Sequence, residues 1–297
     1  MTGDTLRVGL AGAGPWAHKV HAPGIAAHPG TSLAAVWARR GEAAAELAGP
    51  AGALATTDFD ELLAAVDAVA FAVPPAVQAP LAARAAEAGK HLVLEKPVAA
   101  DEEGATALVD AVERAGVVTA MVLTFRYGTA TRAWLDQVHA VEDWVGGEAR
   151  WFSGTLVDTQ YEGSGWRHDG GALADIGPHV FDLLDAALGT VEAVEHARFT
   201  PPGLWHVTLG HENGRLSTAT LSMHTPVVPA VTDFAVHGPR GFLPFDASGD
   251  SADRYATLLD DFTRHVADDK AEHPLDVRRG MHLQRLLGQV EAQVADG

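Results

Sequence analysis

The sequence contains no cysteine among its 297 residues. Disulfide bonds, thiolate nucleophiles and cysteine-ligated zinc sites are therefore excluded. Basic residues are also scarce, because 21 Lys and Arg stand against 39 Asp and Glu, giving a formal net charge of −18 at pH 7. A nucleic acid or an anionic membrane needs a basic face on its partner, so we expect neither as a partner. An anionic small molecule would have to be held by a local cluster of Arg, Lys or backbone N–H groups.

Long hydrophobic runs are absent as well. No uninterrupted apolar stretch is long enough to span a bilayer. The first residues lack the charged segment and apolar run of a secretory signal, so we expect a cytoplasmic protein. Hydrophobic residues nevertheless make up 47% of the chain, which is ample for a packed core. The length suits one large domain or two ordinary ones.

Short apolar segments alternate with helical patterns as far as about residue 125. The sequence predicts strands over residues 6–10, 31–40, 67–75, 91–97 and 117–125. Strands that alternate with helices at this spacing form β-α-β units and a parallel sheet. We therefore expect an α/β fold in which residues 1–123 form a doubly wound domain.

The pattern changes after about Arg126. The sequence predicts strands over residues 148–157, 192–200, 204–212, 215–224 and 232–238. Hairpin-type separators such as Glu212–Gly214 indicate an antiparallel or mixed sheet. One helix interrupts the strands at residues 171–189, and helices return from Arg254. We expect residues 124–297 to form a second, α+β domain, whose final helix is a candidate to pack back toward the first.

A glycine-rich segment follows the first predicted strand. Gly12, Gly14 and Ala17 form the pattern G-x-G-x-x-A, with Pro15 and Trp16 at the variable positions. The first glycine permits a tight turn, the second lets the backbone approach a pyrophosphate, and the alanine allows close helix–strand packing. In this β-α-β context the motif predicts dinucleotide binding, although small-residue turns are common in a chain rich in Ala and Gly.

The end of the second predicted strand discriminates between NAD and NADP. An acidic residue there would accept a hydrogen bond from the ribose 2′-OH. Ala38 occupies that position instead, and Arg39 and Arg40 follow it. Two guanidinium groups suit the 2′-phosphate of NADP, although arginine is also common at the surface after a strand. The sequence thus favours NADP(H), with NAD(H) as the alternative.

Two further groups carry potential chemistry. Lys96 ends an apolar segment that reads as buried, and a buried ammonium costs several kcal/mol unless it is paired. The residue is either functional or simply reaches the surface where the strand ends. Asp175 and His179 lie four residues apart, so in a helix they share a face. His179 could exchange a proton near neutral pH while Asp175 orients it, although such a pair is more often solvated or a helix cap.

Three segments together resemble the Gfo/Idh/MocA oxidoreductase family, which includes glucose-fructose oxidoreductase and inositol dehydrogenase. They are AGAGPWA, AVPPAVQAPLAARAAEAGKHLVLEKPVA and WRHDGGALADIGPHVFDLL. The resemblance extends over most of the chain. It implies an N-terminal Rossmann domain, a C-terminal domain with a large, open, mostly antiparallel sheet, and NAD(P)-dependent chemistry on a sugar, polyol or keto-sugar.

The resemblance also implies roles for particular residues. Catalysis would fall to Lys96, Asp175 and His179, with His179 as the general acid or base. The positions expected to contact the cofactor include the glycine-rich segment and the two arginines. The full set is Gly12, Gly14, Pro15, Trp16, Ala17, Arg39, Arg40, Val73, Pro74, Gln78, Glu95, Lys96 and Pro97. Those expected to contact the substrate are Arg126, Trp166, Arg167 and His179. Gln78 departs from the family, because relatives often carry His there.

Other functions and an assembly also fit the sequence. The protein could be a redox-silent dinucleotide-binding regulator, or a transient-oxidation enzyme (an epimerase or glycosidase) with a tightly held cofactor. We expect no metal site, because the 15 histidines are scattered. Four aromatic residues of the second domain either stack on a sugar or belong to the core or to a dimer interface: Trp151, Tyr161, Trp166 and Trp205. We expect a homodimer or homotetramer through the second sheet, because an uncovered apolar face would otherwise contact water.

Overall fold

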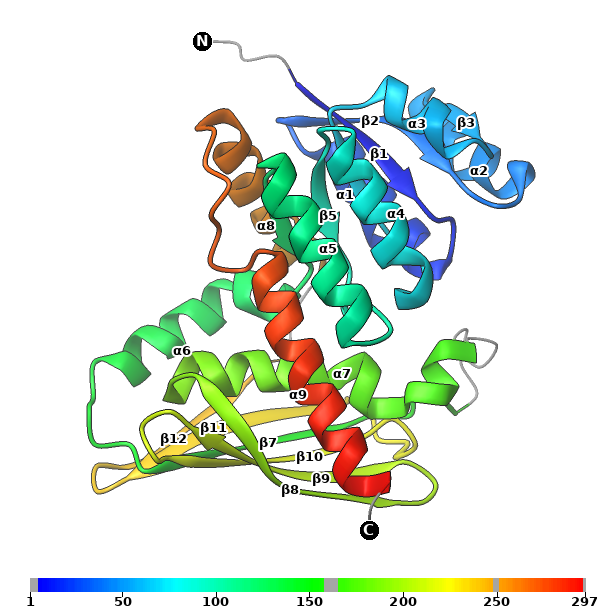
Figure 1. Ribbon diagram of the computed structural model, residues 1–297. Helices are drawn as coiled ribbons and strands as arrows, with labels where there is room; N and C mark the ends of the chain where they lie inside the picture. The colour runs from blue at the N-terminus through cyan, green and yellow to red at the C-terminus, as the bar shows by residue number, and fades with distance from the viewer. Residues whose placement is uncertain (1–4, 158–164, 248–250, 296–297) are drawn as a thin grey trace. The chain divides into compact units, whose positions relative to one another are not determined.

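The chain folds into two compact units. The computed structural model describes residues 5–157, 165–247 and 251–295, without the side chains of residues 166–169 and 251 (Figure 1). The first unit comprises Met1–Thr124 and Asp250–His282. The second comprises Phe125–Gly249 and Leu283–Gly297.

A six-stranded parallel sheet forms the centre of the first unit. Its strands are β1 (Leu6–Ala11), β2 (Thr31–Trp37), β3 (Leu54–Thr56), β4 (Ala68–Phe71), β5 (His91–Leu94) and β6 (Thr119–Met121). The order β3-β2-β1-β4-β5-β6 is that of a doubly wound dinucleotide-binding fold, as predicted. All four residues of β4 are buried, as expected for a central strand covered on both faces. The strand order reverses between β1 and β4, and ligands bind such sheets at the carboxyl ends of the strands there.

Helices connect these strands, and polar caps set several of their ends. They are η1 (Ala17–His21), α1 (Ala22–Ala27), α2 (Gly41–Ala48), η2 (Gly49–Ala51), α3 (Phe59–Ala65), α4 (Pro75–Glu87), α5 (Glu102–Ala115) and α8 (Ser251–Ala267). Asp58 and Asp101 cap the N-termini of α3 and α5 by accepting backbone N–H bonds. The chain leaves α5 through Gly116, whose φ of 66° suits glycine. These caps fix the residues at which α3 and α5 begin.

The segment 250–282 belongs to the first unit, whereas we expected it in the second. Tyr255 of α8 packs on α1 at Gly24, where an added Cβ would lie 2.6 Å from the tyrosine ring. The N–H of Met121 in β6 donates to the carbonyl oxygen of Leu275 (2.7 Å). Helical periodicity identifies α8 as a helix, but it carries no information about which distant surface the helix covers.

The second unit is built on a mixed sheet of the order β12-β11-β7-β10-β9-β8. Its strands are β7 (Gly146–Phe152), β8 (Val191–Thr200), β9 (Leu204–His211), β10 (Leu216–Ser222), β11 (Val231–Gly238) and β12 (Gly241–Asp246). Only the β7–β10 pair within this described sheet is parallel, so the mostly antiparallel sheet is confirmed. The helices of this unit are η3 (Thr124–Tyr127), α6 (Thr129–His139), α7 (Gly165–Leu188) and the greater part of α9 (Val277–Ala295). η3 begins at the last residue of the first unit, and β12 and α6 were not predicted.

One face of the second sheet is covered by α7, which runs along it in Figure 1. Ala149 of β7 is buried, whereas its neighbours Glu148 and Arg150 are exposed on the opposite face. Arg150 pairs there with Asp233 of β11 (2.7 Å). The uncovered face therefore carries many polar side chains. Our expectation that this face is apolar is wrong for this part of the sheet. Phe242 is an exception and is 58% exposed.

Among the described residues, no helix is both long enough and apolar enough to cross a membrane.

Candidate functional site

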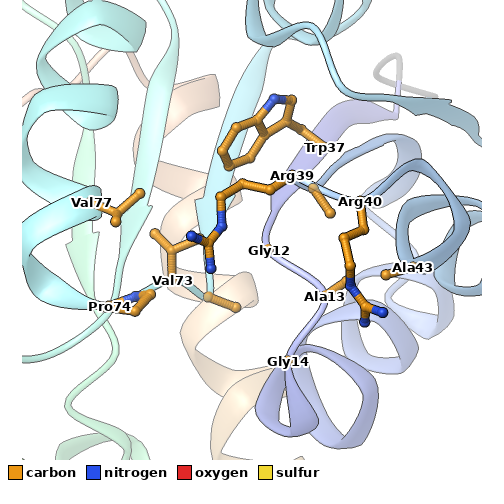
Figure 2. Close-up of a pocket in the computed structure, with 12 residues that line it drawn as sticks. Gly12, Ala13, Gly14, Trp37, Arg39, Arg40, Ala43, Val73, Pro74 and Val77 are labelled. Atoms are coloured by element: carbon orange, nitrogen blue, oxygen red, sulfur yellow. The ribbon is translucent and has the colours of Figure 1, made fainter. Parts of the chain in front are cut away.

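A cavity of about 540 Å³ lies at the carboxyl ends of β1, β2 and β4 in the first unit (Figure 2). It is lined by Gly12, Ala13, Gly14, Trp37, Ala38, Arg39, Arg40, Ala43, Ala72, Val73, Pro74 and Val77. This is the switch point of the sheet, where a dinucleotide is expected. Gly12, Gly14, Arg39, Arg40, Val73 and Pro74 were predicted from the sequence. The rest are small or apolar residues; Ala13 lies inside the glycine motif and Ala38 precedes the arginines, whereas Trp37, Ala43, Ala72 and Val77 belong to no recognisable motif.

Gly12 and Gly14 shape the floor of this cavity in different ways. Gly12 has a φ of 122°, and an added Cβ would lie 2.3 Å from the carbonyl oxygen of Ala72. Its N–H donates to the carbonyl oxygen of Trp37 (2.8 Å), so the turn also joins β1 to β2. An added Cβ on Gly14 would meet nothing within 4 Å. The backbone at Gly14 is therefore open to a ligand, as the phosphate-binding motif requires.

Arg39 and Arg40 supply the charge of the cavity. Figure 2 shows Arg39 on the side of Val73 and Arg40 on the side of Ala43. The residues that line this cavity include both guanidinium groups and no carboxylate. The lining therefore suits an anion, and it has no acidic group to accept a hydrogen bond from a ribose hydroxyl.

The loop after β5 carries Lys96, and hydrogen bonds from the Gln78 side chain hold its backbone. The Gln78 side chain is fully buried. Its Nε2 donates to the carbonyl oxygens of Glu95 (2.7 Å) and Val98 (3.0 Å), and its Oε1 accepts the N–H of Glu95 (2.9 Å). Gln78 thus supports the loop backbone. Its expected contact with a cofactor stays a prediction, as do those of Pro15 and Pro97, which do not line the cavity.

The Glu95 carboxylate also points inward. Its Oε1 accepts the indole N–H of Trp16 (2.7 Å) and lies 2.9 Å from Nε2 of His21. Nδ1 of His21 lies 2.8 Å from the hydroxyl of Tyr255. Sequence reasoning missed His21 and Tyr255. His21 could have been noticed from its place just after the glycine loop, but nothing in the sequence connects Tyr255 with either residue.

Asp175 and His179 lie on α7 in the second unit, and both are buried. Gly171 interrupts α7 with a φ of 56° and a ψ of −148°, so both residues belong to the helical segment that follows this kink. The His179 ring lies beside Phe125 (centroids 5.3 Å apart) and Trp151 (6.0 Å). Phe125 and Trp151 stack on each other at 5.0 Å. An imidazole among aromatic rings is shielded from water, and the short side chain of Asp175 lies on the same helix face.

Arg126 is brought to the same helix. Its guanidinium donates to Oδ1 of Asp182 (3.0 Å), and Asp182 is almost fully buried. Asp182 lies three residues after His179, so the pair adjoins the face that carries His179. The predicted contact of Arg126 with a substrate stays a prediction, and Asp182 is a partner that sequence reasoning missed.

The predicted catalytic residues are divided between the units. Lys96 belongs to the first unit, whereas Asp175 and His179 belong to the second, and their joint action stays a prediction. Trp166 and Arg167 lie in the first turn of α7, but their side chains fall outside the described part, as does the whole of Tyr161. Within residues 5–157, 165–247 and 251–295 there is no group of three or more His, Asp or Glu that could hold a metal ion.

The sheet order and the glycine turn are those of a dinucleotide-binding domain, and a comparison identifies the family of that domain. Residues 6–123 match the model of the oxidoreductase family with an NAD-binding Rossmann fold, GFO_IDH_MocA. By this match, residues 6–123 are identified as a Rossmann domain of the Gfo/Idh/MocA oxidoreductase type.

A curated relative is the dTDP-3,4-didehydro-2,6-dideoxy-alpha-D-glucose 3-reductase of Streptomyces violaceoruber. It is 35% identical over 191 residues, which cover 62% of this chain and 55% of the relative. The chain spans about half the length of the curated relatives it matches.

Solved structures share the whole fold. GenD2 of gentamicin A biosynthesis, in complex with NAD, is 22% identical with a TM-score of 0.87, and the match covers 100% of this chain and 96% of that one. KijD10, a 3-ketoreductase from Actinomadura kijaniata in complex with TDP-benzene and NADP, is 18% identical with a TM-score of 0.81, covering 98% of both chains. At these identities the likeness shows the fold.

Proposed function

We propose that the protein is an oxidoreductase that transfers a hydride between NADP(H) and a sugar, polyol or keto-sugar. The observation that carries this proposal is the cavity at the switch point, with its glycine turn and its two arginines. The family match of residues 6–123 supports the reaction type. The substrate class is supported by relatives named as a dTDP-sugar 3-reductase and a levoglucosan dehydrogenase.

The residues of the cavity fit a dinucleotide. Gly12 makes a turn that no side chain could make, and Gly14 leaves its backbone open to a pyrophosphate. Arg39 and Arg40 hold the 2′-phosphate that distinguishes NADP from NAD. When bound, the nicotinamide accepts or supplies the hydride.

The protein's own side chains manage the substrate oxygen. The Lys96 ammonium stabilises the negative charge that develops on this oxygen. His179 takes the hydroxyl proton in the oxidative direction and returns it in the reductive direction. Asp175 orients His179, and the rings of Phe125 and Trp151 keep water away from the imidazole.

The cofactor preference is tested by titrating the protein with NADPH and NADH and following intrinsic tryptophan fluorescence. We expect NADPH to bind more tightly, and Arg39→Asp to narrow or reverse the preference, because the new carboxylate repels the 2′-phosphate. Arg84→Ala is the matched control, since Arg84 is an exposed arginine of the same unit that pairs with Asp60 (2.7 Å). Tighter NADH binding by the unaltered protein would contradict the NADP assignment.

The reaction is tested with a panel of sugars, polyols and keto-sugars, followed by the absorbance of reduced nicotinamide. A redox-silent regulator would bind the cofactor and turn over none of them. A transient-oxidation enzyme would be purified with a cofactor that does not exchange with added NADP(H). Exchangeable cofactor and stoichiometric turnover are the results expected from the proposed function.

We also propose that the protein assembles as a homo-oligomer through the uncovered face of the second sheet. Phe242, which is 58% exposed, and the Arg150–Asp233 pair are the features that support this surface. This surface combines polar and apolar side chains, which is typical of interfaces that are not dominated by apolar contacts.

A further inference from the structure

The Glu95 carboxylate links two segments of the first unit that are distant in sequence. It receives the indole N–H of Trp16 on Oε1 (2.7 Å) and the backbone N–H of Lys96 on Oε2 (3.2 Å). Trp16 directly follows the glycine loop at the end of β1, whereas Lys96 directly follows Glu95 at the end of β5. β4 lies between these two strands in the sheet, so the carboxylate spans its carboxyl end.

Hydrogen-bond chemistry assigns the role of the two oxygens of this group. An indole N–H and a backbone N–H can only donate, so both oxygens of Glu95 accept in this arrangement. A neutral His21 satisfies the remaining contacts when its Nε2–H donates to Glu95 and its Nδ1 accepts the Tyr255 hydroxyl.

Tyr255 matches this assignment. Burial raises the pKa of Tyr255 well above its usual value, and the negative charge of Glu95 raises it further. The phenol consequently keeps its proton and remains a donor to His21. The ring itself rests on Gly24, where a side chain would collide with it, so the position of Tyr255 is fixed by packing.

We propose that Glu95 is a positioning residue that couples the glycine-rich segment, residues 12–17, to Lys96. The inference rests on the proposed function, in which Lys96 acts on the substrate. The Glu95 side chain is only 11% exposed, which argues against Glu95 as a direct cofactor ligand. Gln78 holds the backbone of the Lys96 loop independently, so the carboxylate contributes the connection to Trp16.

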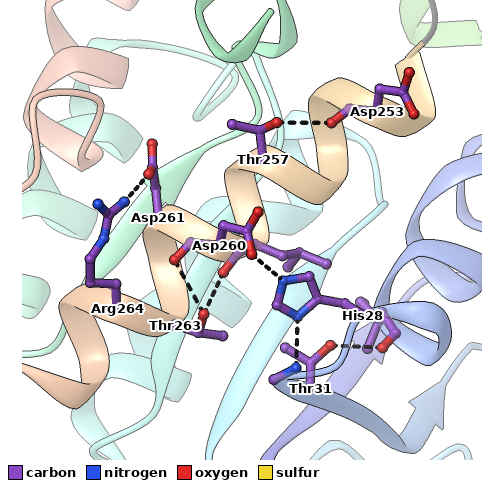
Figure 3. A network of polar contacts seen from close by, with 11 residues as sticks. His28, Thr31, Asp253, Thr257, Asp260, Asp261, Thr263 and Arg264 are labelled. Atoms are coloured by element: carbon purple, nitrogen blue, oxygen red, sulfur yellow. Dashed lines mark hydrogen bonds and ion pairs between the residues drawn. The ribbon is translucent and has the colours of Figure 1, made fainter. Parts of the chain in front are cut away.

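Two variants break this connection with little change of shape. Glu95→Gln is isosteric, but its NH₂ group must face either the Lys96 N–H or the Trp16 N–H, and a donor then meets a donor. Trp16→Phe removes the indole N–H and keeps an aromatic ring. His28→Asn is the control. His28 directly follows α1 and contacts Asp260 of α8 (3.0 Å; Figure 3), the helix that also carries Tyr255, but it does not contact Glu95.

The coupling can be observed without a substrate, because a single backbone amide reports on the loop. The chain has four lysines, and Lys96 is the one that follows a glutamate. Labelling with ¹³C-carbonyl glutamate and ¹⁵N-lysine therefore selects the Lys96 amide in an NMR spectrum. We expect NADP⁺ to shift this signal in the unaltered protein and in His28→Asn, and to shift it less than half as far in Glu95→Gln and Trp16→Phe. The dissociation constant of NADP⁺ should change less than about threefold, because the cavity residues carry the affinity.

Turnover supplies the second readout. Each of the two variants should lower kcat by roughly 10- to 100-fold, the cost of a slightly misplaced catalytic group, with little change in the KM for NADPH. The double variant should lose no more than either single one, because both remove the same connection. A full Lys96 response to NADP⁺ in Trp16→Phe, or additive losses in kcat, would overturn the inference. Failure of the unaltered protein to bind either nicotinamide dinucleotide would instead overturn the proposed function.

Discussion

At the scale of single residues, Lys96 is the position where charge and packing can be separated. Lys96→Met keeps the length of the side chain and removes its ammonium group. We expect turnover to fall by about 10²–10³-fold, the effect of losing one preorganised charge that stabilises a developing oxyanion. NADPH affinity should change much less, because Lys96 does not line the cavity that we propose as the dinucleotide site.

Lys90→Met is the matched control for this change. Lys90 immediately precedes β5, and its Nζ donates to the carbonyl oxygen of Val66 (2.9 Å). Steady-state kinetics on a substrate found in the panel would measure both variants. Full activity in Lys96→Met would return this lysine to the other reading of the sequence, a side chain that surfaces where a strand ends.

His273 makes stability depend on pH. Burial lowers the pKa of His273, and neighbouring His265, whose ring centroid is 4.6 Å away, lowers it further. Histidine in an unfolded chain titrates near about pH 6.5, so the unfolded state binds a proton more readily than the folded state. This contribution to the free energy of unfolding is therefore complete above about pH 6.5 and is lost as the pH falls below that value.

Urea unfolding near pH 7.5 and near pH 5.5, on either side of the unfolded value of about 6.5, measures this loss. His273→Gln removes the titrating ring and keeps an acceptor for the N–H of Leu275, which bonds to Nδ1 at 2.9 Å. The variant should show a smaller drop in the free energy of unfolding between the two pH values. An unchanged drop would mean that other groups cause it.

At the scale of elements, two glycines in the turn after β1 have different roles. Gly12 is needed for the fold, and we expect Gly14 to be needed for binding. Gly12→Ala places a methyl group 2.3 Å from the backbone oxygen of Ala72 at a φ of 122°, so the free energy of unfolding should fall by roughly 1–3 kcal/mol. Gly14→Ala meets nothing, and its stability should stay within about 0.5 kcal/mol. Its NADPH affinity should nevertheless fall by about tenfold, because the methyl group occupies the space of the pyrophosphate.

Thermal unfolding and NADPH titration of both variants test this contrast. A destabilised Gly14→Ala protein, or one that binds NADPH normally, would contradict the roles assigned to the two glycines.

Elements that show local periodicity could be predicted, and those defined by distant contacts could not. Five of the six strands of the first sheet follow from apolar segments between helices. β3 was missed because it is short and two of its three residues are exposed, so it forms no apolar segment. β12 contains Pro244, which is atypical of strands, and it pairs only with β11 in the described sheet. The glycine turn and the arginines were predicted because a motif links them to a ligand. The inward direction of Glu95 was not, because it depends on contacts with Trp16 and His21, which precede it by 79 and 74 residues.

At the scale of the whole molecule, the sequence predicts an oligomer because it predicts an uncovered apolar sheet face. The fold alters that argument. The uncovered face of the second sheet is more polar than expected, so a single exposed aromatic residue carries more weight. We expect light scattering at micromolar concentration to show a dimer or tetramer. Phe242→Asp should shift it toward monomer by placing an unpaired charge in the interface.

Val228→Asp is the control for assembly, since Val228 is 97% exposed in the loop before β11. It should leave the oligomer intact. A monomeric unaltered protein at micromolar concentration would contradict the assembly, and an intact Phe242→Asp oligomer would place the interface elsewhere.

The return of the chain to its first unit has a consequence for synthesis on the ribosome. The Thr119 side chain accepts a hydrogen bond from Val277, 158 residues later, and His21 meets Tyr255 only after 234 residues. At about 5–20 residues per second, Thr119 waits on the order of ten seconds for this partner. The whole second sheet is made in that interval. A nascent chain that binds a dinucleotide early would therefore do so before the Tyr255 hydroxyl is available to His21. The hydrogen-bond network around Glu95 would be completed last.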